Sequence, residues 1–405
     1  GASLSISNDI TSAENITISG TGISSNGAIR NTADDNTLTG LITLGANSEI
    51  QIDTGSSLTL NPTTGSAVTG TYNLTIDSVG TSTISDPIAI STGDLTKTGA
   101  GTLTLSGTNT YSGNTTISAG TITLTGSVNT ATDLSIASGA TLDLQSTQTF
   151  ATLNLNGTIS NSTGSSALTI AGASDIGGSI TTSGTQTYSG AVVLSNDVTL
   201  TTTDSNITFA VTVDGDGTAR DLTIDMDNGV SADGTVQFVN TVGANNSLDV
   251  IDITGNLNLD AAISNTTSLS VSGTSNLGAD VTTSGTQTYT SAVTLSGGDR
   301  ILTGTIINFG STLAGGTNGL TITGNLDLDG AATGLSTLEV SGTSNLGADV
   351  TTSSTQTYTS AVTLSGADRT LTASIVNFVD TLAGGTNGLT ITGNLDLDGA
   401  ATGLT

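Results

Sequence analysis

The sequence predicts an all-β chain folded as a single parallel β-solenoid, with about 20–23 residues in each coil. Three observations support this fold class: short strands with alternating apolar residues, an internal repeat, and very few large aromatic side chains. The alternation occurs, for example, at residues 103–105, 122–124 and 153–155. A period of two is typical of half-buried strands. Strands this short bury too little surface alone, but stacked parallel coils share a continuous narrow core.

The internal repeat gives the period of the fold. Residues 268–336 reappear as residues 337–405, a shift of 69, and the two copies differ at 11 positions. A unit of this length divides into three coils of about 23 residues, so we expect a rod of some 18–20 coils, about 90 Å long at ~4.8 Å per coil. Immunoglobulin-like sandwiches need about 100 residues per unit and a core aromatic residue, so the period disfavours them.

The two copies also act as a small natural mutation series. Ser270 of the first copy is Glu339 in the second, and a position that accepts Glu is expected to face solvent. Its neighbours in a strand then point inward. The same reasoning applies to the Asn-Leu-Asp-Leu segments. We therefore predict two sets, inward Leu257, Leu326, Leu395, Leu269 and Leu338, and exposed Ser270, Glu339, Asp327 and Asp396.

Composition excludes several classes of function. The chain has 33 acidic and five basic residues, a net charge of −28, and no Cys or His. The basic residues are Arg30, Lys97, Arg220, Arg300 and Arg369. Nucleic-acid binding requires a Lys/Arg patch, so we expect no nucleic-acid partner. No run of about 18 apolar residues is present, so no membrane insertion is expected. Only 9% of residues are charged and two are Pro, which disfavours wholesale disorder.

One segment resembles a known family. Residues 95–124, which read Leu-Thr-Lys-Thr-Gly-Ala-Gly-Thr-Leu-Thr-Leu and continue through Gly-Thr-Asn-Thr-Tyr, closely resemble the autotransporter passenger-associated strand repeat. Residues 168–405, with their Thr-Gln-Thr-Tyr segments, resemble repeats of filamentous-haemagglutinin-like adhesins. The resemblance implies a right-handed β-helix, export across a Gram-negative envelope, and a secreted or cell-surface location.

The resemblance also suggests three segments along the chain. Residues 1–93 form irregular N-terminal solenoid coils, residues 94–167 carry the passenger-associated repeat, and residues 168–405 carry the haemagglutinin-like repeats. The chain begins at Gly1 rather than Met, which suggests a processed or excised piece of a longer protein. Residues 1–93 are the least regular part, so a specific binding surface is expected there if anywhere.

The residues that usually carry catalysis are scarce. Without His or Cys, the common nucleophile–base pairs cannot form. Lys97 could serve a Ser–Lys arrangement, but we expect it to be a solvated surface residue. Acidic pairs two residues apart lie about 7 Å from each other on a strand, within the loose range of inverting glycosidases. These pairs are Asp214/Asp216, Asp225/Asp227, Asp327/Asp329 and Asp396/Asp398. The pair Asp327/Asp329 recurs one copy later as Asp396/Asp398, whereas an active site is normally single, so we predict no catalytic residues.

Metal and cofactor sites are not expected either. The Gly-Gly-Thr-Asn-Gly segments at 315–319 and 384–388 begin like the calcium-binding nonapeptide but carry no Asp. We therefore predict no metal site and no cofactor, and a solenoid that stays folded when a chelator is added. Thr-x-Thr triplets at 102–104, 121–123, 321–323 and 390–392 would suggest ice binding if they stacked in one flat column. Their irregular spacing along the chain predicts that they do not stack.

The function expected from these observations is that of a structural or adhesive rod on a bacterial surface, either a filament subunit or a fragment of a giant adhesin. Its partners would be other copies of itself, stacked end to end, and a host, cell or matrix surface. Two alternatives remain open. One is a polysaccharide-active enzyme on the same solenoid, which would show a single cleft with non-repeating acidic residues. The other is a passive spacer or surface-layer protein.

Overall fold

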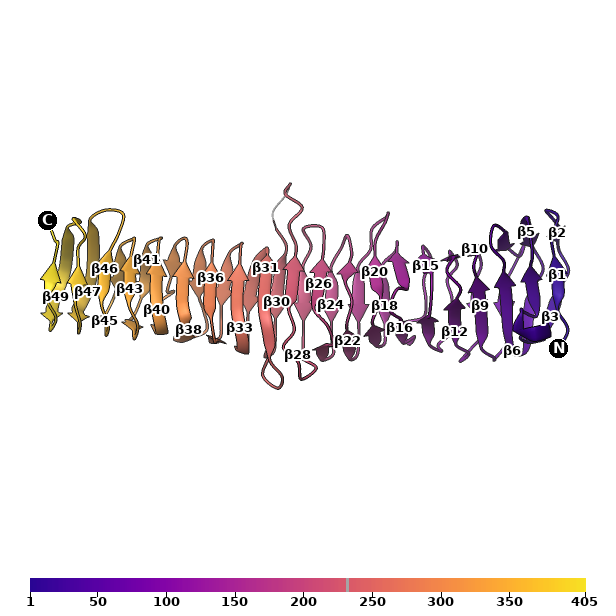
Figure 1. Ribbon diagram of the computed structural model, residues 1–405, viewed down its shortest axis with the longest axis horizontal. Helices are drawn as coiled ribbons and strands as arrows, with labels where there is room; N and C mark the ends of the chain where they lie inside the picture. Colours follow the sequence, from indigo (N-terminus) through magenta and orange to yellow (C-terminus); the bar gives the residue numbers. More distant parts are fainter. Residues whose placement is uncertain (231–232) are drawn as a thin grey trace. The chain divides into compact units, whose positions relative to one another are not determined.

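The computed structural model describes residues 1–230 and 233–405, and in these parts it is almost entirely β (Figure 1). Parallel strands stack as a β-solenoid of about 19 turns with about 20 residues per coil, which confirms the predicted fold class. The chain divides into two compact units, Gly1–Val192 (unit 1) and Val193–Thr405 (unit 2). The three segments proposed from the sequence follow repeat type rather than compactness, so that division stays a prediction. Among the described residues, no helix has the length and apolar character needed to span a bilayer.

Unit 1 has three faces, each a ladder of parallel strands. A 3-10 turn, η1 (Ile23–Ser25), interrupts its first coils. Face A contains β1 (Leu4–Ile6), β4 (Ile29–Asn31), the C-terminal part of β6 (Ile42–Ile52), β9 (Leu74–Ser78), β12 (Leu95–Thr98), β14 (Thr115–Ile117), β16 (Leu134–Ile136), β19 (Leu153–Leu155) and β22 (Ser174–Ile176). Face B contains β2 (Thr11–Ser12), β5 (Asp35–Leu38), β7 (Ser57–Leu60), β10 (Thr81–Ile84), β13 (Thr102–Leu105), β15 (Thr121–Leu124), β17 (Thr141–Leu144), β20 (Thr158–Ser160) and β23 (Ile180–Thr181). Face C contains β3 (Ile16–Gly20), the start of β6, β8 (Val68–Thr69), β11 (Ile88–Ala89), β18 (Gln148–Phe150), β21 (Leu168–Ile170) and β24 (Gln186–Tyr188).

Unit 2 also has three faces, and several of its strands bend from one face to the next. Strand β25 (Val192–Leu194) contains the boundary between the units. Face D contains β26 (Val198–Thr201), β29 (Leu222–Asp225), β31 (Leu248–Thr254), the C-terminal parts of β33 (Ile263–Val271), β38 (Arg300–Phe309) and β40 (Leu320–Leu328), β36 (Thr286–Tyr289), β43 (Ser344–Leu346), β46 (Val362–Leu364), β48 (Leu382–Ala383) and β50 (Ala401–Thr402). Face E contains β27 (Ile207–Phe209), β30 (Thr235–Phe238), β32 (Asn256–Leu259), β34 (Ser275–Leu277), β37 (Val293–Leu295), β39 (Leu313–Ala314), β41 (Ala332–Leu335), β44 (Val350–Thr352) and the starts of β47 (Arg369–Phe378) and β49 (Leu389–Leu397). Face F contains β28 (Val213–Gly215), β35 (Val281–Thr283), β42 (Leu338–Val340), β45 (Thr355–Tyr358), the starts of β33, β38 and β40, and the ends of β47 and β49.

Two long strands of unit 2, β40 and β49, bend at glycines. In β40 the chain leaves face F and enters face D at Gly324, which has a φ of +138°. A Cβ on this residue would lie 1.8 Å from the carbonyl oxygen of Gly304 in the preceding coil. The close approach of the two backbones therefore requires glycine at this corner.

The 69-residue repeat does not correspond to three coils. Within the two copies, paired residues are 17–21 positions apart. The chain follows face D from Leu269 to Gln287, Ile307 and Leu326. Leu338, which is 69 residues after Leu269, lies on face F beside Leu320. One copy contains eleven strand segments. Because three segments, one on each face, make one turn, the copy spans three and two-thirds turns. The expected three coils of 23 residues are therefore wrong, and each copy begins one face away from the copy before it.

The inward and outward positions agree with the copy comparison in all but one case. Leu257, Leu269, Leu326 and Leu338 are buried, while Glu339 and Asp396 are exposed and Ser270 and Asp327 are half-buried on the outer side. Leu395 is 52% exposed, contrary to the prediction. It lies in the last coil of the chain, where its strand β49 has a partner on one side only.

The core of unit 2 combines aliphatic ladders with stacked aromatic rings. Tyr289 and Phe309, in adjacent coils, have ring centroids 5.5 Å apart, and their equivalents one copy later, Tyr358 and Phe378, are 5.3 Å apart. All four rings are fully buried. Offset stacking of this kind adds to the stability gained from burial. The copies thus keep the same core contacts although they lie on different faces.

Candidate binding surfaces

Lys97 is buried, which corrects the expectation of a solvated lysine. It follows Leu95 on an inward position of β12 and is paired with Ile76 and Ile117 of the neighbouring coils. Its Nζ donates hydrogen bonds to the carbonyl oxygens of Thr98 (2.6 Å) and Gly99 (2.7 Å) in its own coil. A buried charge must be hydrogen-bonded to be tolerated, and this corner supplies the acceptors.

The Lys97 ammonium also reaches the coils on both sides. It lies 3.2 Å from the carbonyl oxygen of Ser78 in one neighbouring coil and 3.4 Å from that of Ala119 in the other. Burial lowers the pKa of Lys97 to about 8, and the nearby Asp77 carboxylate partly offsets this shift. The side chain therefore links three successive coils, and its engagement with four carbonyl groups leaves it badly placed to act on a bound molecule.

The four arginines are engaged within the chain as well. Arg30 forms an ion pair with Asp53 (2.7 Å), and Arg220 forms an ion pair with Asp216 (2.8 Å). The hydrogen bonds that Asp216 accepts from Arg220 and from the Thr218 N–H lower the pKa of Asp216 to about 2. Arg300 donates to the carbonyl oxygen of Gly278 at 2.7 Å.

Arg369, the equivalent of Arg300, donates to the carbonyl oxygens of Leu346 (3.2 Å) and Ser365. Each of the five basic residues therefore has its charge directed to an internal acceptor. In the described parts of the chain, the outer surface presents acidic groups without free Lys or Arg side chains to balance them. The described surface therefore lacks the Lys/Arg patch on which nucleic-acid binding depends.

Several aspartates hold the coil corners. The carboxylates of Asp94, Asp280, Asp299 and Asp349 each accept a hydrogen bond from a backbone N–H of the next coil, at 2.7–3.0 Å. These N–H groups lie at strand ends, where no ladder partner is available, so a carboxylate satisfies them. Much of the acidic excess is thus part of the solenoid's hydrogen bonding, a role that sequence spacing alone did not indicate.

The acidic pairs that the sequence offered for catalysis are dispersed. Asp327 lies outward on face D and accepts a hydrogen bond from Asn345 (2.8 Å), while Asp396 lies on face F. Asp214 is buried and accepts hydrogen bonds from the backbone and side-chain nitrogens of Asn245 (both 2.9 Å). Within residues 1–230 and 233–405, no three acidic side chains gather in a geometry that could hold a metal ion.

The Gly-Gly-Thr-Asn-Gly segments form corners. The amide of Asn318 donates to the carbonyl oxygens of Gly315 (2.9 Å) and Leu295 (3.2 Å), the second of which belongs to the preceding coil. Asn387 makes the same two contacts one copy later, to Gly384 and Leu364. The asparagine therefore closes the turn and joins it to its neighbour.

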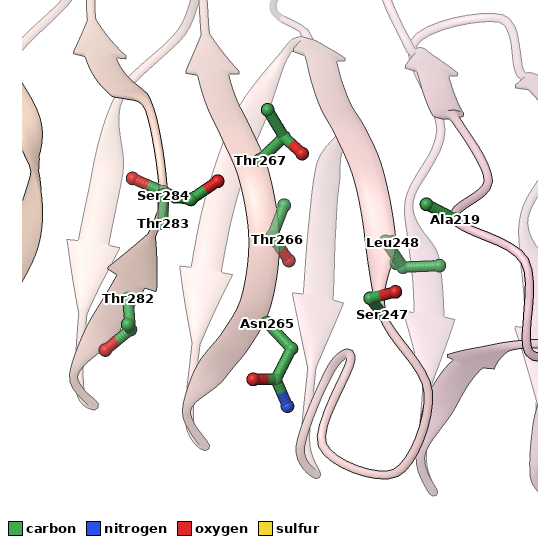
Figure 2. Close-up of a pocket in the computed structure, with 9 residues that line it drawn as sticks. All are labelled: Ala219, Ser247, Leu248, Asn265, Thr266, Thr267, Thr282, Thr283 and Ser284. Carbon is green, nitrogen blue, oxygen red and sulfur yellow. The ribbon is translucent and has the colours of Figure 1, made fainter.

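A shallow groove of about 360 Å³ crosses four coils of unit 2 where face F turns into face D (Figure 2). Its residues are polar but uncharged, apart from two apolar members, and comprise Ala219, Ser247, Leu248, Asn265, Thr266, Thr267, Thr282, Thr283 and Ser284. The buried hydroxyls of Thr266 and Thr283 donate to backbone carbonyl oxygens, which leaves the outer side chains to meet a ligand. Such a lining suits a neutral hydrogen-bonding ligand and contains no acid–base pair.

The same groove recurs with the repeat. A smaller trough of about 190 Å³ is lined by Thr317, Gly334, Leu335 and residues 351–353, each of which is 69 positions after a member of the first groove. It lies at the end of face E rather than face F, because the copy is rotated by one face. A ligand that fits both grooves would therefore be held at two different orientations around unit 2.

The Thr-x-Thr triplets of unit 1 stack on face B, contrary to the expectation from their spacing. Thr81, Thr102 and Thr121 are consecutive partners, as are Thr83, Thr104 and Thr123 in the second column. The variation in coil length is taken up in the corners, so the strands remain in register.

The segment at residues 95–124 forms a continuous part of the solenoid in unit 1, from β12 to β15. Asn109 is buried and links neighbouring coils: its Oδ1 accepts the Ile88 N–H (2.9 Å) and its Nδ2 donates to the Ser127 carbonyl oxygen (3.0 Å). The hydroxyl of the fully buried Tyr111 lies 2.7 Å from that of Thr115. With Lys97, these residues supply the polar contacts inside this part of the core.

Residues 95–124 match the family model described as the passenger-associated-transport-repeat. The chain carries an autotransporter passenger repeat. The match covers the strands and the buried Lys97, Asn109 and Tyr111, and confirms the resemblance of residues 95–124 to the passenger repeat. The haemagglutinin-like resemblance of residues 168–405 stays a prediction. No curated protein and no solved structure matches the chain. The passenger repeat implies a secreted or cell-surface location.

Proposed function

We propose that this chain is an adhesive and structural segment of an autotransporter passenger, exposed on the surface of a Gram-negative bacterium. The observation that carries the proposal is the passenger repeat at residues 95–124, which is built into the solenoid as a continuous set of strands. Passenger repeats and a β-solenoid together suggest a passenger domain. The stacked coils serve to extend a surface away from the cell, and the outer face supplies the contacts.

The repeated copies of unit 2 support multivalent contact with a cell or matrix surface. Equivalent outward residues, such as Asp327 and Asp396, lie on faces D and F. A partner that recognises one copy meets the next copy at a different angle, so several weak contacts can form around the same stack. Weak contacts linked in this way give strong attachment through high effective concentration. The acidic outer surface, whose described basic side chains are all engaged internally, favours neutral or cationic partners.

Stacking between coils supports self-association along the solenoid axis. Leu326 and Leu328 of β40 are covered by the coil that contains β43. Contacts of the same kind between coils of two copies, or of one longer polypeptide, would pair strand edges and bury such leucines. The net charge of −28 opposes side-by-side contact between such stacks.

A polysaccharide-active enzyme is the alternative from a different class. It requires a single acidic cleft, whereas the four acidic pairs are distributed over faces D and F and the adjoining loops of unit 2. Incubation of the chain with a panel of polysaccharides, followed by measurement of reducing ends, separates the two functions. Reducing ends released by this chain would favour the enzyme over the adhesive segment.

The proposed function is tested by displaying the chain on cells. The chain is fused to an autotransporter translocation domain, and matched cells display a version that lacks residues 268–336. We expect both to be accessible to antibody at the cell surface, and attachment to a matrix-coated surface to be stronger with the longer chain, because it carries one more copy. Equal attachment by both and by cells without the chain would contradict the adhesive role.

A further inference from the structure

Face B of unit 1 presents two parallel columns of hydroxyl side chains. The first column runs through Ser57, Thr81, Thr102, Thr121, Thr141 and Thr158. The second runs through Thr11, Thr37, Thr59, Thr83, Thr104 and Thr123. Four consecutive coils, from β7 to β15, contribute a residue to both columns. This set of four rows is called the threonine array.

The threonine array is regular in both directions. Strands β7, β10, β13 and β15 pair over four residues each without a shift in register. Neighbouring strands are therefore about 4.8 Å apart along each column, and the two columns are about 7 Å apart along the strand. Inward residues such as Leu58, Leu103 and Ile122 are buried beneath the array and fix the orientation of each row.

The hydroxyls of the array are available to a ligand, except that of Ser57, which donates a hydrogen bond to the Asp35 carboxylate (2.6 Å). Within the described chain, the side chains of Thr81, Thr83, Thr102, Thr104 and Thr121 donate no hydrogen bond to a protein group, whereas Thr39 and other corner threonines bond to backbone carbonyl oxygens. Each array side chain is partly exposed, and each threonine offers a hydroxyl and a methyl group side by side. No charged residue lies in the four rows; Asp35 and Asp143 occupy the adjacent positions beyond them.

We propose that the threonine array binds the surface of ice crystals. The spacings of about 4.8 and 7 Å are close to repeats of oxygen atoms in the ice lattice, so successive hydroxyls can occupy lattice positions in two dimensions. The methyl groups favour ordered water between the hydroxyls, and the absence of charge within the rows avoids strongly hydrated groups that would disrupt the match. This activity goes beyond adhesion and does not depend on it.

Unit 2 provides an internal comparison for this proposal. Its triplet at Thr321 and Thr323 is flanked by Ile301 in one neighbouring coil and by Glu339 in the other. The triplet at residues 390–392 stacks on residues 370–372, which makes two rows. Neither set reaches the four charge-free rows found on face B, so ice binding is assigned to unit 1.

The test measures incorporation of the purified full chain into slowly grown ice, together with thermal hysteresis. The wild-type chain is compared with Thr102→Lys and Thr104→Lys in the centre of the array, and with Thr116→Lys. Thr116 is a matched control because it is an outward, half-exposed threonine in β14 on face A. Circular dichroism establishes that each variant keeps the β-rich fold.

We expect the wild-type chain and Thr116→Lys to enter ice and to produce thermal hysteresis, and the two array variants to be excluded like a non-binding protein. Exclusion of the wild-type chain from ice would overturn the proposal, as would equal loss in Thr116→Lys and Thr104→Lys. Retention of the chain on cellulose or chitin that is lost in Thr104→Lys, without incorporation into ice, would overturn it in favour of a crystalline polysaccharide ligand.

Discussion

Unit 1 and unit 2 consist of the same kind of coil but differ in how the sequence pattern relates to one turn. On face B of unit 1, similar strands recur once per turn, so Thr102 lies directly beside Thr81 and Thr121. In unit 2 the 69-residue copy spans three and two-thirds turns, so Leu269 and Leu338 lie on different faces. A pattern that recurs once per turn builds a flat array on one side. A pattern that recurs after a fractional turn distributes the same groups around the stack.

This difference explains why the two units offer different surfaces. Unit 1 concentrates threonines in adjacent rows, which suits a large repetitive ligand. Unit 2 places its acidic positions and its shallow grooves on successive faces, which suits contact with a rough surface from several directions. The fold accommodates both patterns, because most inward residues on every face are apolar.

The largest expected effect concerns the core of unit 2. Phe309→Ala and Phe378→Ala each remove a fully buried ring that stacks on a tyrosine, and each should lower the free energy of unfolding by about 3–5 kcal/mol. The two losses should agree, because the copies keep the same contacts on different faces. Denaturant titration of each variant measures the losses, with Asn308→Ala as an outward control. A large loss at only one of the two positions would contradict the equivalence of the copies.

The next effect concerns the buried lysine of unit 1. Lys97→Met removes the donor that serves four carbonyl oxygens and should lower the free energy of unfolding by about 1–3 kcal/mol at pH 7. The matched control is Thr96→Ala, an outward neighbour in β12, which should change it by less than about 0.5 kcal/mol. An unaltered stability of Lys97→Met would mean that the carbonyl groups of this corner need no donor.

The pH dependence of unit 1 follows from the same lysine. The pKa of Lys97 is about 8 in the folded protein, below the value of about 10.4 for an unfolded lysine, so the unfolded chain holds more protons between these values. The contribution of this group to stability is therefore lowest below pH 8 and rises as the pH passes from 8 to above 10. The difference in unfolding free energy between wild type and Lys97→Met should widen from pH 7 to pH 10. A constant difference would contradict the lowered pKa.

A smaller effect is expected at buried serines of unit 2. The hydroxyls of Ser275 and Ser344, equivalent residues on faces E and D, are buried without a hydrogen-bond partner in the described structure. Ser275→Ala and Ser344→Ala should therefore leave stability unchanged or raise it by up to about 1 kcal/mol. Thr283→Ala, whose hydroxyl does donate to a carbonyl oxygen, should instead cost about 1 kcal/mol in the same titration. A clear loss in both serine variants would reveal a partner for these hydroxyls.

The smallest effect is expected where the copies differ on the outside. Ser270→Glu and Glu339→Ser exchange the residues of the two copies, and each should change the free energy of unfolding by less than about 0.5 kcal/mol. The reason is that both positions are outward, on faces D and F. Thermal unfolding of both variants provides the measurement. A loss of several kcal/mol for Ser270→Glu would mean that the strand faces the other way.

The sequence was sufficient to predict the solenoid, because alternation and repetition are local properties that survive in any stacked arrangement. The inward positions of Leu257, Leu269, Leu326 and Leu338 follow directly from that alternation. The number of coils per repeat could not be obtained this way, since the corners vary in length and only the strand pairing shows where each turn closes.

The interior role of Lys97 was missed for a related reason. The charge of a lysine suggests an outward position. The signal that contradicts this is the alternation itself, because Lys97 lies two residues after Leu95, in phase with the inward side. The threonine array was missed because its rows are separated by unequal numbers of residues, which suggests that the rows are not aligned with one another. In the structure the unequal lengths are absorbed outside the strands, and the rows align.

The most direct test of the account is a distance measurement between spin labels. The chain has no cysteine, so Cys can be introduced in pairs at Ser270, Asp327 and Glu339 without competing sites. Ser270 and Asp327 are three strands apart on face D, and their backbones should be separated by about 14 Å. Ser270 and Glu339 are equivalent positions 69 residues apart, but they lie on faces D and F and should be clearly farther from each other. If the pair at 270 and 339 gave the short distance and the pair at 270 and 327 the long one, each copy would span three whole turns and the rotation between copies would be refuted.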